Sequence, residues 1–579
     1  MTELKQNDLD SFQIKQWIKQ YRNVDPVVLQ PPDMDAATLK SLEKNEITSG
    51  LEAYSGEWTK QQTRHLLSRT LFGVKKSELD YFFGLSMEEA VELIIAESPI
   101  PDPPVNNYEG INQNAQDPHV DLGETWIEAP HAAGKEGLRI VSLKAWIINN
   151  ILQQQPTIHE KLVLFWSNLL VTKVWDVYNS KASYKYYQML YDNALGNYRS
   201  FIKNLTLDPS MLIFLNGTTN TRTEPDENYG RELQELFCIG KGPDSKYTEG
   251  DVQAAARVLT GWTFDWSTRR KEGPAKSFFD HFKHDKDDKK FSSFYGNKVI
   301  EGQLGGWGRD ETDDLLDMIF ENEETSKYIC RRIYSFFVSN VISESVEENI
   351  ISPLAEIFRN NNYELKPVLM KLFKSAHFYD VQNHGALIKS PADHLLGLWR
   401  TLGLKSTNTE NLLENYRILR GLHWNLSNAG MEIGDPPTVA GWAPYYQAPQ
   451  YDKAWITTDT ITKRAKATDA ILYWGFWISR QLRIKSDLPE FIASFDNPSD
   501  PNEMLGEAEL LLLGVETSEE TRSELKAILL SGQQQDYYWS LAWNEYAADP
   551  ADSAKKQTVE NRLKPVFKRI LQLGESHLM

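Results

Sequence analysis

Long stretches of helical periodicity constrain the fold more than any other feature of this sequence. Between residues 138 and 260 apolar residues recur every three or four positions, as in LKAWIINNILQQ with Leu143, Trp146, Ile147 and Leu152. This spacing places the apolar side chains on one face of a helix. The pattern returns in residues 313–404 and in the C-terminal part, and there is no internal repeat and no run of alternating strands. The sequence therefore predicts an all-α, large multi-helix fold.

Two long irregular loop insertions interrupt the periodicity, near residues 263–311 and 425–455. The first is rich in Gly, Asp, Lys and aromatic residues, and the second is dense in Gly, Pro, Trp and Tyr. Insertions of this length between helices are often functional. We divide the chain into an N-terminal leader at 1–57, a helical domain at 58–530 and a C-terminal helical extension at 531–579.

The acidic composition argues against a nucleic-acid partner. The 579 residues include 81 Asp and Glu against 62 Lys and Arg, which gives a formal net charge of −19. Broad binding to a phosphate backbone needs clustered basic side chains instead. No window approaches about 18 consecutive apolar residues, so we expect no membrane span. The N-terminus lacks the basic-then-apolar pattern of a secretory signal, and as written we expect the chain to be cytoplasmic.

Some residues have a simple structural explanation. Thr248 and Asp251 in the sequence TEGD form an N-capping pattern before an apolar helix, and Thr517 begins a similar pattern before SELKAILL. Cys238 and Cys330 both lie in apolar helical stretches and form no C-x-x-C pair. We expect both cysteines to be small buried hydrophobic residues.

Several segments, in order, resemble the domain-of-unknown-function 1800 family of uncharacterised bacterial helical proteins. The segments that carry the resemblance are RHLLSRTLFG from Arg64, DNALGNYRSFIKNLTLDPSMLIFLNG from Asp192, ENYGRELQELFCIG from Glu227 with YTEGDVQAAARVLTGW up to Trp262, His284-Asp285, KSPADHLLGLWRTLG from Lys389, and DPPTVAGW from Asp435. The resemblance covers about residues 60–530.

The resemblance implies a cellular context rather than a reaction. Relatives are often exported and often encoded beside sulfatase-like exported proteins, which points to work on the cell envelope or on polysaccharide. This chain departs from the family pattern at two positions. Leu169 stands where the family has a His, and Met431 replaces the Gln that follows a Gly ahead of the double proline.

The helix that starts near Glu227 carries the best candidates for chemistry. At 100° per residue, Asn228, Glu232 and Glu235 fall within about 60° of one another. Two carboxylates on one face suit a divalent metal ion, and they also suit general acid and base roles if their pKa values differ. Arg231 and Asn228 would then contact the substrate. The alternative is that both glutamates form ion pairs with Arg231, Arg257 or another helix.

A second candidate group lies in the segment HFKHDKDD. Imidazole and carboxylate groups are a common mixed ligand set for a metal ion, and the family resemblance selects His284 and Asp285. We therefore predict a metal site formed by Glu232, Glu235, His284 and Asp285. The alternative is a solvated charged loop with no ligand.

Aromatic residues in the loops form a third group. Flat rings with polar edges are common stacking surfaces for sugars and common anchors at protein interfaces. The candidates for carbohydrate contact are Trp262, Trp442 and Tyr445. The alternative is that these rings only close the packing between helices and loops.

These observations lead to two hypotheses about function. The first is a metal-assisted enzyme that acts on a polysaccharide or glycoside, with Glu232 and Glu235 as catalytic residues. The second is a non-catalytic binding or assembly protein that partners a sulfatase-like protein. The first requires the carboxylates, His284 and Asp285 to meet in one cleft.

Overall fold

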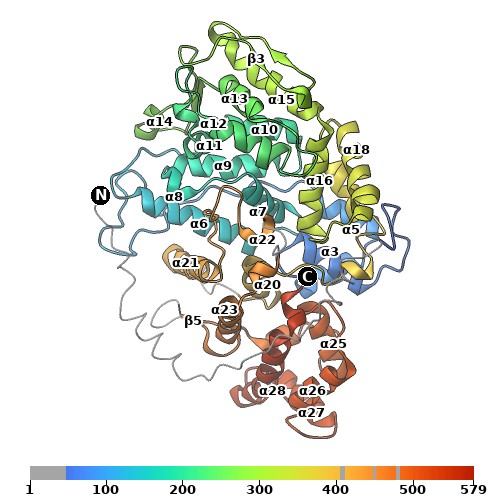
Figure 1. Cartoon of the computed structure of the whole chain (residues 1–579). Coiled ribbons are helices and arrows are strands. Elements are labelled where there is room, and N and C mark those ends of the chain that lie inside the picture. The colour runs from blue at the N-terminus through green and yellow to red at the C-terminus, as the bar shows by residue number, and fades with distance from the viewer. Residues whose placement is uncertain (1–46, 405–410, 447–451, 478–482) are drawn as a thin grey trace. The chain divides into compact units, whose positions relative to one another are not determined.

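Figure 1 presents a computed structural model of the chain, which describes residues 47–404, 411–446, 452–477 and 483–579. Most of the predicted leader at 1–57 lies outside the described residues. The chain is mainly helical, as predicted. The strands in the described part are short and form three antiparallel pairs. No helix of the described residues is both long enough and apolar enough to span a bilayer.

The first part of the described chain is a series of helices, with a long irregular stretch between α5 and α6 at residues 95–135. Their bounds are α3 (Lys60–Thr70), α4 (Lys76–Phe83), α5 (Met87–Ile94), α6 (Glu136–Gln153), α7 (His159–Leu169), α8 (Val174–Val177), α9 (Ser180–Asn193), α10 (Tyr198–Thr206), α11 (Pro209–Phe214), the 3₁₀ turn η1 (Gly217–Thr219), α12 (Glu227–Glu232), the π-helical turn η2 (Leu233–Cys238) and α13 (Glu249–Val258). The predicted capping pattern before α13 is confirmed, because Thr248 and Asp251 form a reciprocal capping box there. Cys238 and Cys330 are free and buried, as predicted.

The segment predicted as the first loop insertion contains short regular elements. These are β1 (Trp262–Phe264), α14 (Ser267–Arg270), β2 (Ser277–Phe279), β3 (Lys289–Lys290), η3 (Ser293–Tyr295), β4 (Val299–Ile300) and η4 (Gly305–Asp310). β1 pairs with β2, with Thr263 opposite Phe278, and β3 pairs with β4, with Lys289 opposite Ile300. Two small hairpins therefore give this segment a defined backbone.

Helices return after this segment and continue to the C-terminus. Their bounds are α15 (Glu311–Glu321), α16 (Glu323–Phe337), α17 (Glu344–Val346), η5 (Glu347–Ile351), α18 (Ser352–Asn360), α19 (Leu365–Phe373), η6 (Val381–Asn383), α20 (Pro391–Thr401), α21 (Leu412–Asn428), α22 (Ala443–Tyr446), η7 (Asp452–Trp455), α23 (Thr458–Asp469), η8 (Ala470–Trp474), α24 (Leu488–Ile492), α25 (Pro501–Leu512), α26 (Glu519–Leu529), α27 (Tyr537–Ala548), α28 (Ser553–Gln572) and η9 (Gly574–His577), with the strand pair β5 (Phe476–Trp477) and β6 (Arg483–Ile484) between η8 and α24. In the segment of the second predicted loop, α21 runs on to Asn428, residues 429–442 are irregular, and residues 447–451 lie outside the described residues. The cap of α26 is Ser518 rather than the predicted Thr517, whose hydroxyl donates to Glu509 instead.

The two ends of the described chain pack onto its middle. The amide of Tyr54 donates to the carbonyl of Lys374, and the amide of Ala376 donates to Glu52. At the other end α28 packs against α26 and α27, and its apolar side chains join the main hydrophobic core. The last residues then return to α20, where the amide of Lys389 donates to the carbonyl of His577. Residues near 64, 389 and 577 are thereby brought together.

Candidate functional site

The two predicted catalytic carboxylates lie where the α-helix widens into a π-helical turn. Asp226 caps α12 by accepting a hydrogen bond from the amide of Asn228 at 2.9 Å. Glu232 is the last residue of α12, and Glu235 lies within η2. Single π-turns inside helices frequently occur at functional sites. The prediction from 100° spacing therefore holds for Asn228 and Glu232, whereas the wider turn changes the angle at Glu235.

A close approach between helices fixes the position of α12. A Cβ atom at Gly230 would lie only 3.0 Å from the amide nitrogen of Ala256 and 3.2 Å from the carbonyl oxygen of Val252. Only glycine leaves room for two helix backbones at this distance. α12 is therefore held directly against α13, and the backbone that carries Glu232 has little freedom to move.

The environment of Glu232 differs from that of Glu235. Burial, followed by the negative charge of Glu235, raises the pKa of Glu232 to about 7, against the opposing effect of Lys241. The Glu232 Oε2 atom is buried and has no hydrogen-bond partner among the described residues. Glu235 forms an ion pair with Lys241. One carboxyl therefore retains its proton up to about pH 7, and the other is ion-paired with a lysine; two carboxyls in such different environments are the arrangement that acid–base chemistry needs.

The neighbours of this pair include one residue that the sequence did not single out. Burial, followed by the charge of Glu235, raises the pKa of the half-buried Tyr247 hydroxyl to about 12, so this ring lies near the carboxylates. The predicted substrate contact Arg231 donates instead to Glu227 and Glu249, at 3.0 and 2.7 Å. The only sequence signal for Tyr247 is its place directly before the Thr248 cap.

His284 and Asp285 belong to a separate group of side chains, which we call the paired cluster (His284, Asp285, Lys289, Glu311 and Arg257). His284 is buried, and its Nε2 atom lies 2.9 Å from Glu311 Oε1. Glu311 also accepts from Lys289 Nζ at 2.5 Å, and Asp285 accepts from Arg257 Nε at 2.7 Å. Each charge in this cluster therefore has a partner of opposite sign.

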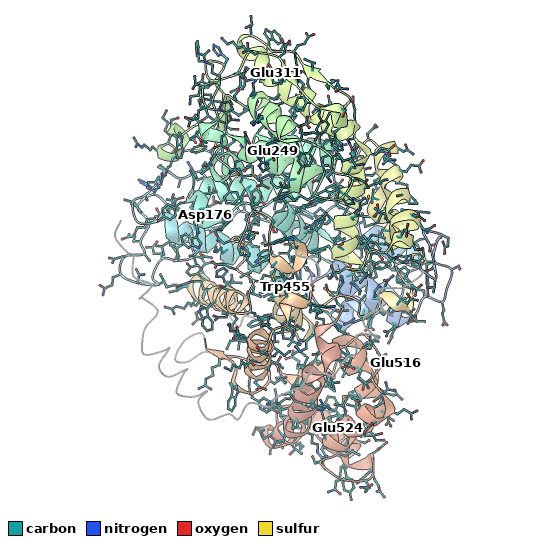
Figure 2. The ribbon with its side chains drawn as sticks, in the orientation of Figure 1. Asp176, Glu249, Glu311, Trp455, Glu516 and Glu524 are labelled. Atoms are coloured by element: carbon teal, nitrogen blue, oxygen red, sulfur yellow. The ribbon has the colours of Figure 1, made fainter. Side chains whose placement is uncertain are left out.

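The four predicted metal ligands thus fall into two groups with separate contacts. Glu232 and Glu235 form one group near Lys241, and His284 and Asp285 belong to the paired cluster. Within the described part of the chain, no three or more His, Cys, Asp and Glu side chains gather in a way that could hold a metal ion. Figure 2 labels Glu249, the partner of Arg231, and Glu311, the partner of His284. The metal site formed by Glu232, Glu235, His284 and Asp285 stays a prediction, and the contacts of His284 and Asp285 are those of a structural network.

The predicted aromatic contacts differ in exposure. Trp262 is half-buried, and its indole N–H donates to Thr312 Oγ1 at 3.0 Å. Trp442 is 2% exposed, and Tyr445 packs against Phe336 and Trp455 with ring centroids 5.5 Å apart in both pairs. Trp442 is therefore in the core, while Trp262 and Tyr445 retain part of their surface.

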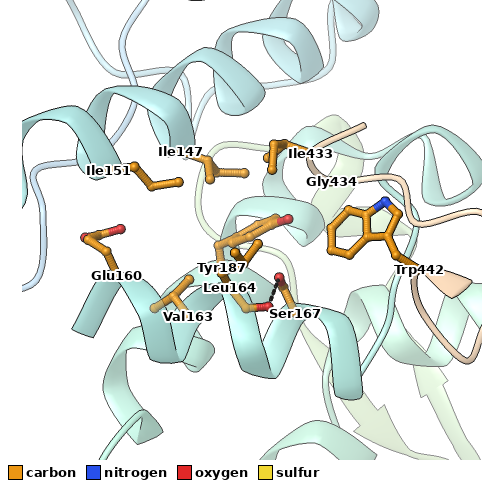
Figure 3. A pocket seen from close by; sticks show the side chains of 10 residues that line it. All are labelled: Ile147, Ile151, Glu160, Val163, Leu164, Ser167, Tyr187, Ile433, Gly434 and Trp442. Carbon is orange, nitrogen blue, oxygen red and sulfur yellow. Dashed lines mark hydrogen bonds between the residues drawn. The ribbon is translucent and has the colours of Figure 1, made fainter. Parts of the chain in front are cut away.

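Trp442 lines a small internal cavity together with α6, α7 and α9 (Figure 3). Its volume is about 10 Å³, which is room for about one water molecule. Burial raises the pKa of Glu160, at the edge of this cavity, to about 7, and Tyr191 donates to its Oε2 atom at 2.8 Å. The cavity is too small for a sugar, so Glu160 does not contact a sugar there.

Comparison with known proteins settles the family. The sequence model of the family described as "Protein of unknown function (DUF1800)" matches residues 65–552. The chain belongs to this family. No curated protein and no solved structure matches it. The DUF1800 match begins within α3 and ends just before α28, so it includes Glu232, Glu235 and the whole paired cluster.

Both positions at which the sequence is predicted to differ from the family pattern are buried. Leu169 is 3% exposed, and Met431 has no exposed surface. Asn168, next to Leu169, accepts a hydrogen bond from the amide of Trp442 at 2.9 Å. α7 therefore contacts the loop that contains DPPTVAGW. Leu169 and Met431 are both apolar and buried.

Proposed function

We propose that this DUF1800 protein is an acid–base hydrolase of a polysaccharide or glycoside, with Glu232 as the proton donor and Glu235 as the second carboxyl of the pair. The observation that carries the proposal is the contrast between the two carboxyls. The pKa of Glu232 is raised to about 7 by burial and by Glu235, whereas Glu235 is neutralised by Lys241. Glycoside hydrolysis commonly uses one protonated and one ionised carboxyl.

Two further features support a sugar as the substrate class. Tyr247 lies close enough to Glu235 for the carboxylate charge to raise the pKa of its hydroxyl. An aromatic ring beside a carboxyl pair is a common platform for a sugar ring. Lys241 is 68% exposed, so it can leave Glu235 without disrupting the core.

The metal-assisted form of this hypothesis has less support from the contacts. Glu235 and Asp285 each have a basic partner, Lys241 and Arg257, which a cation would have to displace. A hard cation bound to Glu232 and Glu235 alone would still need further oxygen ligands. Metal content by plasma mass spectrometry, with Glu232→Ala alongside, tests this form directly.

Hydrolysis of a panel of polysaccharides and aryl glycosides, followed as released reducing ends or aryl alcohol, tests the enzyme proposal. We expect Glu232→Gln to lower the rate by about 100-fold or more, because general acid catalysis contributes about that much. The wild-type rate should fall above about pH 7 as Glu232 ionises. The matched control is Glu227→Gln on the same helix, whose partner is Arg231. Equal rates for Glu232→Gln and wild type would refute the assignment.

The second candidate is a binding or assembly protein, and exposed aromatic side chains favour it. The segment 262–311 exposes four large rings, namely Trp266 at 53%, Phe278 at 47%, Phe282 at 71% and Trp307 at 69%. Exposed rings gathered on one segment are typical of surfaces that bind sugars or proteins. This segment would then contact a polysaccharide or a sulfatase-like partner.

Affinity electrophoresis in gels that contain soluble polysaccharides tests this second candidate. We expect retardation of the wild type and loss of retardation in Trp307→Ala. The matched control is Trp474→Ala, which removes an exposed ring, 48% accessible, from η8 instead. Equal retardation of both variants and the wild type would exclude binding through Trp307.

A further inference from the structure

A second internal cavity, of about 40 Å³, lies between α3, α20 and the C-terminal residues. Figure 1 places the C-terminus beside α3 and α20. Its lining includes Arg64, Lys389, Asp393, His394 and Ser576. At about 10–15 Å³ for one water, the cavity has room for about three water molecules or one small ion.

Basic side chains surround this cavity, and we call Arg64, Lys389 and Arg464 with the space between them the cationic cavity. The side chains of Arg64 and Arg464 are buried, and Lys389 is half-buried. Arg464 is joined to the cavity wall because it donates to the carbonyl of Lys389 at 2.7 Å. Lys389 donates to the carbonyls of Ser576 and Leu512, at 2.8 and 3.3 Å.

The carboxylate of this region is already engaged. One oxygen of Asp393 forms an ion pair with Lys161, and the other accepts from the amide and hydroxyl of Ser390 in the cap of α20. Within the described part of the chain, neither Arg64 nor Lys389 nor Arg464 forms an ion pair. The cationic cavity therefore holds more positive than negative charge.

Several polar atoms around the cavity also lack hydrogen bonds. Arg64 Nε, Arg464 Nε and Nη1, and His394 Nε2 are buried and without a partner among the described residues. The guanidinium of Arg64 lies directly against Gly514, where an added Cβ atom would collide with it. The backbone thus holds this guanidinium in place even though it makes no hydrogen bond with the described residues.

An uncompensated buried charge is costly, and folded proteins rarely retain one without a counter-ion. The cost is visible at Lys389, where burial, followed by the charge of Arg64, lowers the pKa of the ammonium to about 7. Water molecules in the cavity could accept hydrogen bonds from the guanidinium groups, but they would not balance the charge. A bound anion would do both.

We propose that the cationic cavity binds a small tetrahedral oxyanion, inorganic phosphate or sulfate. Guanidinium groups bind such oxyanions through paired N–H donors, and the ammonium adds a point charge. The volume is sufficient for a free ion. Bound there, the anion links α3, α20 and the C-terminal residues through their side chains. This site is independent of the acid–base function proposed for Glu232.

Thermal unfolding of the full-length protein, dialysed free of phosphate and sulfate, tests this proposal. The ions are sodium phosphate and sodium sulfate, with sodium chloride at the same ionic strength as the reference and glucose 1-phosphate as the bulky monoester. We expect phosphate, sulfate or both to raise the midpoint saturably, by about 2 °C or more once the ion exceeds its dissociation constant about a hundredfold. Calorimetric titration should give one site for each chain.

The variants separate this site from general salt effects. Arg64→Met should lose the rise given by the oxyanion, and Arg309→Met, which removes an exposed arginine, should retain it. Lys389→Met is a second variant in case Arg64→Met does not fold. No difference between the oxyanions and chloride in the wild type would overturn the proposal, as would an undiminished rise in the folded variant. An equal rise with glucose 1-phosphate would overturn the restriction to a free ion.

Discussion

The paired cluster and the cationic cavity both bury charged side chains, yet they differ in how those charges are balanced. In the paired cluster, Glu311 lies between His284 at 2.9 Å and Lys289 at 2.5 Å. In the cationic cavity, Arg64 and Lys389 face each other's charge without a carboxylate partner of their own among the described residues. The charges of the paired cluster are therefore balanced by the protein itself, whereas those of the cationic cavity are not balanced by the described residues.

The difference separates a structural role from a ligand-binding role. A buried network in which each charge is paired has no need for a ligand, and its parts fix the hairpin β3–β4 to α15. A buried group of like charges gains stability when a counter-ion binds. His284, predicted as a metal ligand, lies in the first kind of environment. The basic residues of the second kind were not singled out from the sequence.

Removal of Glu311 should give the largest loss of stability. Glu311→Ala leaves Lys289 buried and unpaired, and it also leaves His284 and the amide of Gln303 without their acceptor. Breaking a buried ion pair costs about 3–5 kcal/mol because the remaining charge is uncompensated. Urea unfolding followed by circular dichroism measures this loss. The control Glu249→Ala removes a carboxylate from the exposed pair with Arg231 and should leave the midpoint nearly unchanged.

In the cationic cavity, by contrast, we expect removal of a charge to raise the stability of the protein. In buffer without phosphate or sulfate, Arg64→Met removes a buried charge that makes no hydrogen bond with the described residues. Even a paired buried charge can often be replaced by well-packed apolar side chains with no loss or with a gain of about 1–4 kcal/mol, and a charge without a partner is costlier to bury. Urea unfolding should therefore give a higher midpoint for the variant. A loss similar to that of Glu311→Ala would show that Arg64 has a partner and would end the contrast between the regions.

Local patterns in the sequence predicted much of the helical structure. The cap at Thr248 was predictable because its partner Asp251 is only three residues away. The cap of α26 was placed one residue early, since Thr517 and Ser518 are equally suitable by type. Glu509, from the preceding helix, binds the hydroxyl of Thr517 and leaves Ser518 as the cap. The local sequence therefore predicts that a helix begins here, and tertiary contacts determine which residue caps it.

The candidate sites were less predictable, because their partners are distant in the sequence. The pairing of His284 with Glu311 spans 27 residues and crosses a hairpin. Lys241, which neutralises Glu235, follows the π-turn, and α-helical spacing could not place it. Arg64 and Lys389 occur in two segments that carried the family resemblance. Only the folded chain brings them to the same cavity.

Glu232 is a single acid whose buried Oε2 atom has no hydrogen-bond partner among the described residues, and its ionisation should affect stability. The folded-state pKa of about 7 lies above the ordinary value of 4.5, so the folded protein holds this proton more tightly. The stability that Glu232 contributes is therefore fully present below about pH 4.5 and is lost as the pH rises through 7. Glu232→Gln lacks this ionisation, so it should unfold later than wild type at pH 8 and with wild type at pH 4.5.

The size of this effect is reduced because solvent reaches part of the Glu232 side chain. We expect a gain of about 1 kcal/mol at pH 8 after solvent screening. Thermal unfolding at both pH values measures the difference, and other acids such as Glu160 titrate in both proteins and cancel. Equal gains at pH 4.5 and pH 8 would assign the effect to packing and not to the ionised carboxyl.

Asp285→Asn gives the smallest expected change and tests where the paired cluster ends. Asp285 accepts from Arg257 Nε at 2.7 Å, and the side chain of Arg257 is 30% exposed, so water can replace much of this interaction. Asparagine keeps the oxygen that accepts from the amide of Asp287 and from Arg257 Nη2, but its NH2 group replaces the oxygen that accepts from Arg257 Nε, so the change removes the charge and that one hydrogen bond. Pairs of this kind contribute about 0.5 kcal/mol, and urea unfolding at low and high salt would show a small loss that salt diminishes. A loss as large as that of Glu311→Ala would mean that the rim and the buried centre unfold as one unit. In that case Asp285 belongs to the structural network as fully as Glu311 does, and it could not be released to hold a metal ion without loss of the fold around it.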